Sequence, residues 1–293
     1  MTSNFDTSDK NAQKGGDFVP RLAMINDIAG FGRCSTTVSL PVISVMKVQV
    51  CPVPTSVLSN HLGFPLCHFD DYTSHMRDYI KVWNELGLTF DGLYCGFLGN
   101  EEQIDIVREF VEMFRPPLFL LDPVMGDHGR AYSSITETHV QKMKELLPLA
   151  DIITPNITEA CLLTGTPYRE DYDLPRLRDI LRKLAELGPR HVVLTGVPYG
   201  PDKLGVLAYT PAEDRFFEYG SHRIDAHFPG TGDLFSSACV GALMRGKPLE
   251  EALRLAVDFT LLCIQVTCRD ENAPWYGVEF EKALRYLPEL LER

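Results

Sequence analysis

The chain has 293 residues, of which 45% are hydrophobic and 23% are charged, which is the balance of a globular protein with a sizeable buried core. Its formal net charge of −12 and the lack of a Lys/Arg cluster argue against nucleic-acid binding, which needs a basic surface. No stretch approaches the roughly 18 apolar residues that a membrane-spanning helix requires. An anionic ligand would therefore be held locally, by backbone N–H groups, a helix N-terminus and a divalent cation.

The cysteines and the N-terminal segment indicate the compartment and the domain boundaries. Eight cysteines form no Cys-x-x-Cys pair and mostly lie inside apolar stretches, so we expect buried free thiols in a reducing compartment, the cytoplasm. Residues 1–17 are polar, lack the apolar centre of a signal peptide and are predicted to be a flexible leader. No repeat or Gly/Pro/Ser-rich linker follows, so residues 18–293 are predicted to form a single domain.

From Arg21 onward, short apolar runs alternate with longer amphipathic segments, which is typical of βαβ units and predicts an α/β fold with a mostly parallel sheet. Buried strands are expected at 21–25, 118–121, 151–153 and 191–194, each followed directly by polar residues. Helices are expected at 101–114, 134–147, 174–187 and 249–263. Because open parallel sheets bind ligands beyond the carboxyl ends of their strands, we expect a site assembled from several strands.

Three other patterns do not predict a site. The stretch 241–247 resembles a phosphate-binding P-loop, but Pro248 replaces the magnesium-binding Ser or Thr and a helix pattern precedes it. The glycines of 30–32 lack the third glycine of a dinucleotide fingerprint, because Ser35 stands there, which excludes a dehydrogenase. Glycine and proline interrupt the only regularly spaced histidines, so no zinc site is expected at His61, His68 and His75.

The strongest local signal is the stretch 228–235, Phe-Pro-Gly-Thr-Gly-Asp-Leu-Phe. Apolar residues recur at helical spacing beyond it, so Gly230, Thr231 and Gly232 are predicted to begin a helix. The two glycines would let the backbone N–H groups converge on a point where the helix dipole adds positive charge, an anion hole suited to a phosphoryl group. Asp233 beside it is predicted to be the base that takes the proton of an attacking hydroxyl, the alternative being an acid that only stabilises the first helical turn.

Carboxylates follow two neighbouring strands. Asp122 and Asp127 follow the strand 118–121, and Thr154, Asn156 and Glu159 follow the strand 151–153. Oxygen ligands suit magnesium, so Asp122 and Glu159 are candidate metal ligands that would hold the ion on ATP directly or through water. Asn156 and Glu159 also fit a helix capping box, which leaves a structural role open for Glu159.

Together these motifs resemble the ribokinase-like superfamily and, within it, the pyridoxal kinase branch, over about residues 21 to 270. The resemblance rests on Asn26-Asp27, Ser59-Asn60-His61, Asp122-Pro-Val-Met-Gly-Asp127, Thr154-Pro-Asn-x-x-Glu159 and Gly230-Thr-Gly-Asp233. It implies a three-layer αβα sandwich, commonly a homodimer, that uses ATP with Mg²⁺ and often a monovalent cation such as K⁺.

The resemblance also implies roles for individual residues. Asp233 would be the catalytic base and the stretch 230–232 would bind phosphate. The ATP phosphates and magnesium would be surrounded by Asp122, Asp127, Thr154, Asn156 and Glu159. Thr195 would lie near the nucleotide and Tyr132 would cover it, while the pyridine ring of the substrate would face Asn26, Asp27 and His61.

The substrate is less sharply indicated than the chemistry. Ser59-Asn60-His61 resembles the pyridoxal kinases, whereas Asn26-Asp27 resembles the Ser-Asp of hydroxymethylpyrimidine kinases. We therefore expect phosphorylation of the 5′-hydroxyl of pyridoxal or a related B6 vitamer. The alternatives are a hydroxymethylpyrimidine kinase of thiamine synthesis and a catalytically silent nucleotide-binding module of the same fold.

Overall fold

The computed structural model describes residues 18–292, so the predicted leader at 1–17 lies outside the described residues. Its central feature is a nine-stranded sheet with the order β11-β10-β9-β8-β5-β4-β1-β2-β3. The parallel strands are β1 (Arg21–Ala29), β2 (Gln49–Leu58), β4 (Gly92–Cys95), β5 (Phe119–Leu121), β8 (Ile152–Ile153) and β9 (His191–Pro198). Antiparallel strands complete the two edges, namely β3 (Phe69–Asp71), β10 (Lys203–Thr210) and β11 (Arg215–His222).

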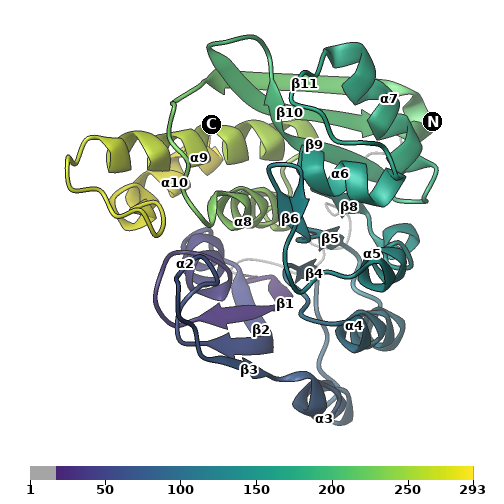
Figure 1. Cartoon of the computed structure of the whole chain (residues 1–293). Helices are drawn as coiled ribbons and strands as arrows, with labels where there is room; N and C mark the ends of the chain where they lie inside the picture. Colours follow the sequence, from purple (N-terminus) through teal and green to yellow (C-terminus); the bar gives the residue numbers. More distant parts are fainter. Residues whose placement is uncertain (1–17, 293) are drawn as a thin grey trace.

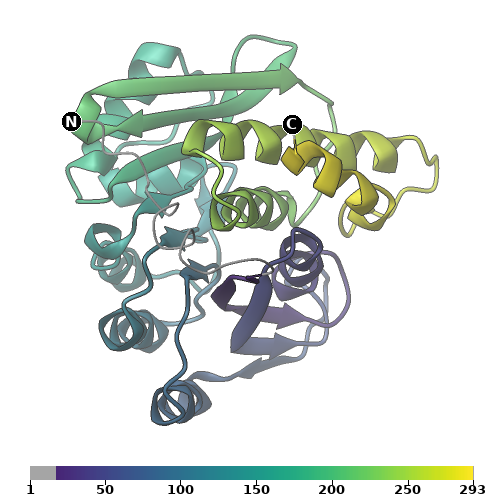
Figure 2. The ribbon, with the colours of Figure 1, turned by 180° about the vertical axis from the view of Figure 1, so that it is seen from behind.

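Helices cover both faces of this sheet (Figures 1 and 2). One face carries α2 (Thr36–Val45), α8 (Thr231–Met244) and α9 (Leu249–Cys268), with α10 (Leu287–Glu292) packed on α9. The other face carries α3 (Thr73–Glu85), α4 (Glu101–Phe114), α5 (Glu137–Met143), α6 (Ile157–Thr164) and α7 (Leu174–Ala185). Short 3₁₀ turns lie at 147–149, 211–213, 280–282 and 284–286.

Each face of the sheet has its own hydrophobic core. Along β1, Leu22 and Met24 pack against the α8 side, whereas Ala23 and Ile25 pack against the α4 side, as the two-residue period of a strand requires. All four side chains are fully buried. The predicted three-layer α/β architecture is therefore confirmed. Among residues 18–292, no helix has both the length and the apolar character needed to cross a bilayer.

Several element boundaries differ from the predictions. β1 does not end before Asn26 and Asp27, because its pairing with β2 continues through a bulge and reaches Ala29. β9 likewise continues past Thr195. The helix predicted at 134–147 begins only at Glu137, where the Thr136 hydroxyl caps it by accepting the N–H of His139. α9 continues five residues beyond Cys263.

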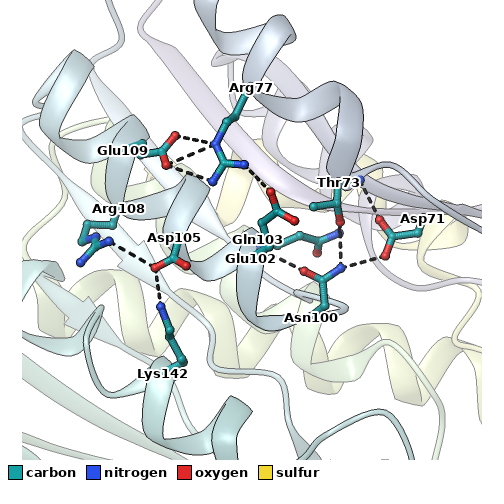
Figure 3. Close-up of polar contacts among 10 residues, drawn as sticks. All are labelled: Asp71, Thr73, Arg77, Asn100, Glu102, Gln103, Asp105, Arg108, Glu109 and Lys142. Carbon is teal, nitrogen blue, oxygen red and sulfur yellow. Dashed lines mark hydrogen bonds and ion pairs between the residues drawn. The ribbon is translucent and has the colours of Figure 1, made fainter.

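Polar contacts tie the outer helices α3, α4 and α5 to one another (Figure 3). Arg77 of α3 pairs with Glu102 and Glu109 of α4, and Lys142 of α5 donates to Asp105 of α4 at 2.6 Å. Exposed ion pairs are each worth only about 0–1 kcal/mol, so these contacts orient the helices more than they stabilise the fold. No predicted site residue belongs to this group, and the candidate site lies at the carboxyl ends of the central strands.

Candidate active site

The N-terminus of α8 is built around Gly230. Its φ of 79° lies in the left-handed region, and a Cβ there would meet the carbonyl oxygen of Arg33 at 2.0 Å, so only glycine fits. Gly232 differs, because it lies within the first helical turn without a positive φ and a Cβ there would meet nothing within 4 Å. The expectation that both glycines bend the backbone is therefore wrong for Gly232. Its lack of a side chain leaves the helix N-terminus open to a ligand.

Asp233 lies beside this opening, and a backbone group near the start of the described chain holds its carboxylate. Its Oδ2 accepts the backbone N–H of Ser35 at 2.8 Å, at the N-terminus of α2. The pKa of Asp233 is raised, because burial of the carboxylate outweighs the hydrogen bond from Ser35 and the favourable effect of the Asn26 amide. A carboxylate with a raised pKa, fixed at an open helix N-terminus, has the chemistry of a general base.

A chain of buried hydrogen bonds links α8 to the carboxyl ends of β5 and β8. The hydroxyl of Ser236 donates to Oδ2 of Asp122 at 2.9 Å and lies 3.1 Å from the hydroxyl of Thr154. Burial, and next the charge of Asp233, raise the pKa of Asp122. The structure therefore brings Asp122, Thr154 and Asp233 together. Sequence reasoning missed Ser236, although its position one helical turn after Asp233 places it on the same side of α8.

Glu159 has the structural role that the sequence left open. Its Oε2 accepts the N–H of Asn156 at 2.8 Å while Asn156 Oδ1 accepts the N–H of Glu159 at 2.9 Å, which completes a capping box for α6. Its Oε1 accepts the N–H of Met125 at 3.1 Å. Burial, and next the charge of Asp122, hold the pKa of Glu159 well above its ordinary value. Each oxygen retains a second lone pair, so the cap leaves room for an ion or its water.

These buried carboxylates suit a hard divalent cation. None of the ion pairs found within residues 18–292 involves Asp27, Asp122, Glu159 or Asp233. Buried charges are normally paired with a cation or coordinate a metal. Within the described part of the chain, Asp122 and Glu159 accept hydrogen bonds only from hydroxyl and backbone N–H groups. The residues present therefore fit Mg²⁺, which prefers a few carboxylate oxygens and retains several waters.

A small hairpin places Asp127 and Tyr132 over this group. It consists of β6 (Gly126–Asp127) and β7 (Arg130–Ala131), and the Asn156 side chain anchors it by donating to the carbonyl of Gly126 at 2.9 Å. Tyr132 follows β7 directly and is partly exposed, and partial burial, followed by the charges of four nearby carboxylates, raises the pKa of its phenol. Those carboxylates belong to Glu159, Asp127, Asp233 and Asp122.

The residues predicted to face the substrate ring separate into two places. Asn26 Oδ1 accepts the N–H groups of Phe97 at 2.9 Å and Asp27 at 3.0 Å, which holds Asn26 and Asp27 in place within β1. The pKa of Asp27 is raised to about 7, mainly by burial and also by the charge of Asp233, against the lowering effect of a hydrogen bond from Ser35. Asp27 is therefore close to the proposed base.

His61 belongs to an aromatic group instead. Its ring centroid lies 4.7 Å from that of Phe64 and 5.8 Å from that of Trp275, and burial lowers its pKa. Among residues 18–292, no hydrogen bond, ion pair or ring contact joins His61 to Asp27. Thr195 lies beside Asn156 of the site, since the two residues pair in the sheet and the Thr195 N–H donates to the carbonyl of Pro155 at 2.9 Å. The aromatic group was not predicted, because Trp275 is more than 200 residues from His61 in the sequence.

The fold and the site together define a small-molecule kinase of the ribokinase-like superfamily. The site combines the open N-terminus of α8 at Gly232, the proposed base and the buried carboxylates. Residues 86–274 match the family described as phosphomethylpyrimidine kinase, and the chain belongs to that family.

Relatives and solved structures agree with this placement. A Bacteroides thetaiotaomicron protein described as a phosphomethylpyrimidine kinase, solved with pyridoxal, is 41% identical with a TM-score of 0.88, covering 92% of this chain and 96% of that one. Pyridoxal kinase from Lactobacillus plantarum is 29% identical with a TM-score of 0.87, covering 94% and 99%. Pyridoxal kinase from Arabidopsis thaliana is 28% identical over 248 residues, which cover 80% of this chain and 78% of the relative.

Proposed function

We propose that this protein transfers the γ-phosphoryl group of ATP to the 5′-hydroxyl of pyridoxal or a related B6 vitamer, pyridoxine or pyridoxamine. The observation that carries the proposal is the pair formed by Asp233 and the unobstructed backbone at Gly232. The base and the phosphoryl site are adjacent in sequence, so the attacking oxygen and the phosphorus would meet between them.

The chain's own residues supply base catalysis and charge stabilisation. Asp233 takes the proton of the 5′-hydroxyl as the hydroxyl oxygen attacks the γ-phosphorus. The bond from that phosphorus to the bridging oxygen of ADP breaks. The N–H groups of 230–232 hold the negative oxygens of the transferring group. Asp122 and Glu159 would hold Mg²⁺, directly or through water, and the ion would neutralise charge on the phosphates. Asp127, Thr154, Asn156, Tyr132 and Thr195 would surround the nucleotide, and K⁺ is a further candidate ion.

A B6 vitamer as the substrate is supported by the Bacteroides protein solved with pyridoxal and by the two pyridoxal kinases. A second candidate substrate is hydroxymethylpyrimidine. It is supported by Asp27 and by the Haemophilus influenzae hydroxymethylpyrimidine/phosphomethylpyrimidine kinase, which is 34% identical over 173 residues but covers only 58% of this chain and 63% of the relative.

Further parts of the proposal concern organisation. One domain spanning 18–293 is supported by the single sheet that holds strands from Arg21 to His222. A homodimer is supported by the family resemblance and by exposed Val57 and Phe69 near the β2–β3 edge, and light scattering would test it. A cytoplasmic location is supported by eight free cysteines, all within the described part of the chain and five of them buried.

One experiment tests the function. Phosphorylation rates would be measured side by side for pyridoxal, pyridoxine, pyridoxamine and hydroxymethylpyrimidine, with ATP and Mg²⁺. The proposal expects the highest kcat/KM for a B6 vitamer. A higher value for hydroxymethylpyrimidine would favour the second candidate. Nucleotide binding without turnover of any of the four would establish a silent module.

A further inference from the structure

A second group of ligand-bearing side chains lies outside the buried carboxylates. Asp127, His128 and His227 each offer one ligand atom, and these three atoms all lie within 4.8 Å of one another. Asp127 is half-buried and both histidines are exposed. The imidazole rings of His128 and His227 meet edge to face, with centroids 4.8 Å apart. Two segments about a hundred residues apart in sequence thus direct nitrogen and oxygen ligands at one place.

The geometry is already close to that of a metal site. His128 Nε2 lies 3.5 Å from Asp127 Oδ2. Ligand atoms in a tetrahedral Zn²⁺ site are about 3.3 Å apart, because each lies roughly 2.0–2.1 Å from the ion. Only modest rotation of exposed side chains would bring the third ligand into place. Two imidazoles and a carboxylate leave a further position for water or another ligand.

The turn at position 128 tolerates a histidine. His128 and Gly129 join β6 to β7 with φ values of 49° and 76°, as the two central residues of a type I′ hairpin turn require. Asn-Gly or Asp-Gly is the most common pair in such a turn, and histidine is also among the residues enriched at a positive φ. His128 therefore fits the turn, and its imidazole lies against that of His227.

We propose that Asp127, His128 and His227 bind a borderline divalent transition-metal ion, of which Zn²⁺ is the representative. Imidazole nitrogens select zinc, cobalt, nickel or copper over magnesium, so this site differs in chemistry from the oxygen-only group at Asp122 and Glu159. Bound metal links the β6–β7 hairpin to the segment that leads from β11 into the N-terminus of α8. The ion thereby restrains two segments that flank the proposed phosphoryl site.

Zinc binding to tag-free protein, measured by calorimetry with zinc chloride alone, tests the proposal. We expect one ion per chain, retained in excess Mg²⁺, and a Co²⁺ spectrum without thiolate-to-metal charge transfer. His128→Asn suits the turn while removing the imidazole, and His227→Gln removes the other. Each should weaken zinc binding by more than the 10–100-fold that substitutions outside the ligand shell typically cost.

The controls separate this site from incidental zinc binding. His75→Gln removes an exposed histidine on α3, and Cys268→Ser removes the one cysteine among those described that is exposed. Both should leave the affinity unchanged. Zinc should also slow amide hydrogen exchange at 126–131 and 223–229 in the wild type and in neither ligand variant. Absence of a stoichiometric ion, or its retention in both His128→Asn and His227→Gln, would overturn the proposal. The zinc titrations contain no nucleotide or vitamer, so their result is independent of the proposed kinase activity.

Discussion

The Asp233 carboxylate accepts the backbone N–H of Ser35 at 2.8 Å, across 198 residues of sequence. Ser35 has a φ of 53°, which is uncommon for a residue other than glycine, and it also donates its hydroxyl to Asp27. One residue at the start of α2 therefore positions two acids, the proposed base and the proposed ring contact.

Asp233→Asn should separate chemistry from binding. The amide oxygen can still accept the Ser35 N–H, so the fold and the ATP affinity should change little, whereas loss of the base should lower turnover by about 10²–10⁴-fold. Single-turnover phosphorylation of pyridoxal and calorimetry with ATP would measure the two effects. Asp225→Asn, at a fully exposed acid, is the matched control. Near-normal turnover of Asp233→Asn would refute the base assignment.

Gly232→Val and Gly230→Ala should fail in different ways. A Cβ at Gly232 meets no neighbouring atom within 4 Å, so the variant should keep most of its thermal stability while losing both ATP affinity and turnover. Gly230→Ala should destabilise the fold by more than about 1 kcal/mol, because it combines a left-handed backbone with a clash against the Arg33 carbonyl. Thermal unfolding and ATP calorimetry on both proteins would check this contrast. Unchanged ATP affinity in Gly232→Val would place the phosphates elsewhere.

Glu159→Gln should raise the Mg²⁺ concentration needed for half-maximal activity and should slow turnover. It should also destabilise the protein by about 1–3 kcal/mol, because both carboxylate oxygens accept backbone N–H groups and the amide nitrogen cannot. Asp173→Ala removes the side-chain cap of the next helix, α7, at a residue outside the proposed site, and is the matched control for stability alone. If both variants lose stability and neither alters the Mg²⁺ dependence, Glu159 serves only as a cap.

Asp27→Ser should change the ranking of substrates. A buried carboxylate that hydrogen-bonds a ring substituent discriminates by leaving a polar group unpaired when the wrong ring binds. We expect the ratio of kcat/KM for hydroxymethylpyrimidine to that for pyridoxal to shift by about tenfold or more, since a lost polar match is worth over 1 kcal/mol. Equal changes for all four substrates would show that Asp27 does not discriminate.

Asp27 should also make stability depend on pH. Its pKa rises from 3.8 to about 7 in the folded protein, so the folded state holds this proton more tightly than the unfolded state. Its contribution to stability is therefore complete below about pH 4 and is lost as the pH rises through about 7. Relative to Asp27→Asn, the unliganded wild type should lose about 2–3 kcal/mol between pH 5 and 8. Denaturant unfolding at both pH values would measure the difference, and a pH-independent difference would contradict the prediction.

Local chemistry explains which parts of the site the sequence could predict. Each buried parallel strand has a strong apolar pattern, so the positions of Asp122, Thr154 and Asn156 beyond their strands followed directly. The capping box of Glu159 and the helix start at Thr231 follow from neighbouring residues in the same way.

Contacts between distant segments were not predictable in this way. Ser35 and the Arg33 carbonyl approach α8 only after the sheet has formed, and no periodicity marks them. The extension of β1 to Ala29 likewise depends on a bulge, in which Thr55 and Ser56 of β2 lie opposite Asp27 alone. The binding roles of the site residues stay predictions, since each requires a bound ligand to test it.

The two halves of the proposed site rest on opposite faces of the sheet. α8, with Asp233, packs in the core on one face, and α6, with Glu159, packs in the core on the other. The distance between base and metal ligands is thus set by side-chain packing above and below the strands. Loosening either core alone would misalign the two halves by a fraction of an ångström while the chain stays folded, so catalysis would fail at a lower temperature than unfolding.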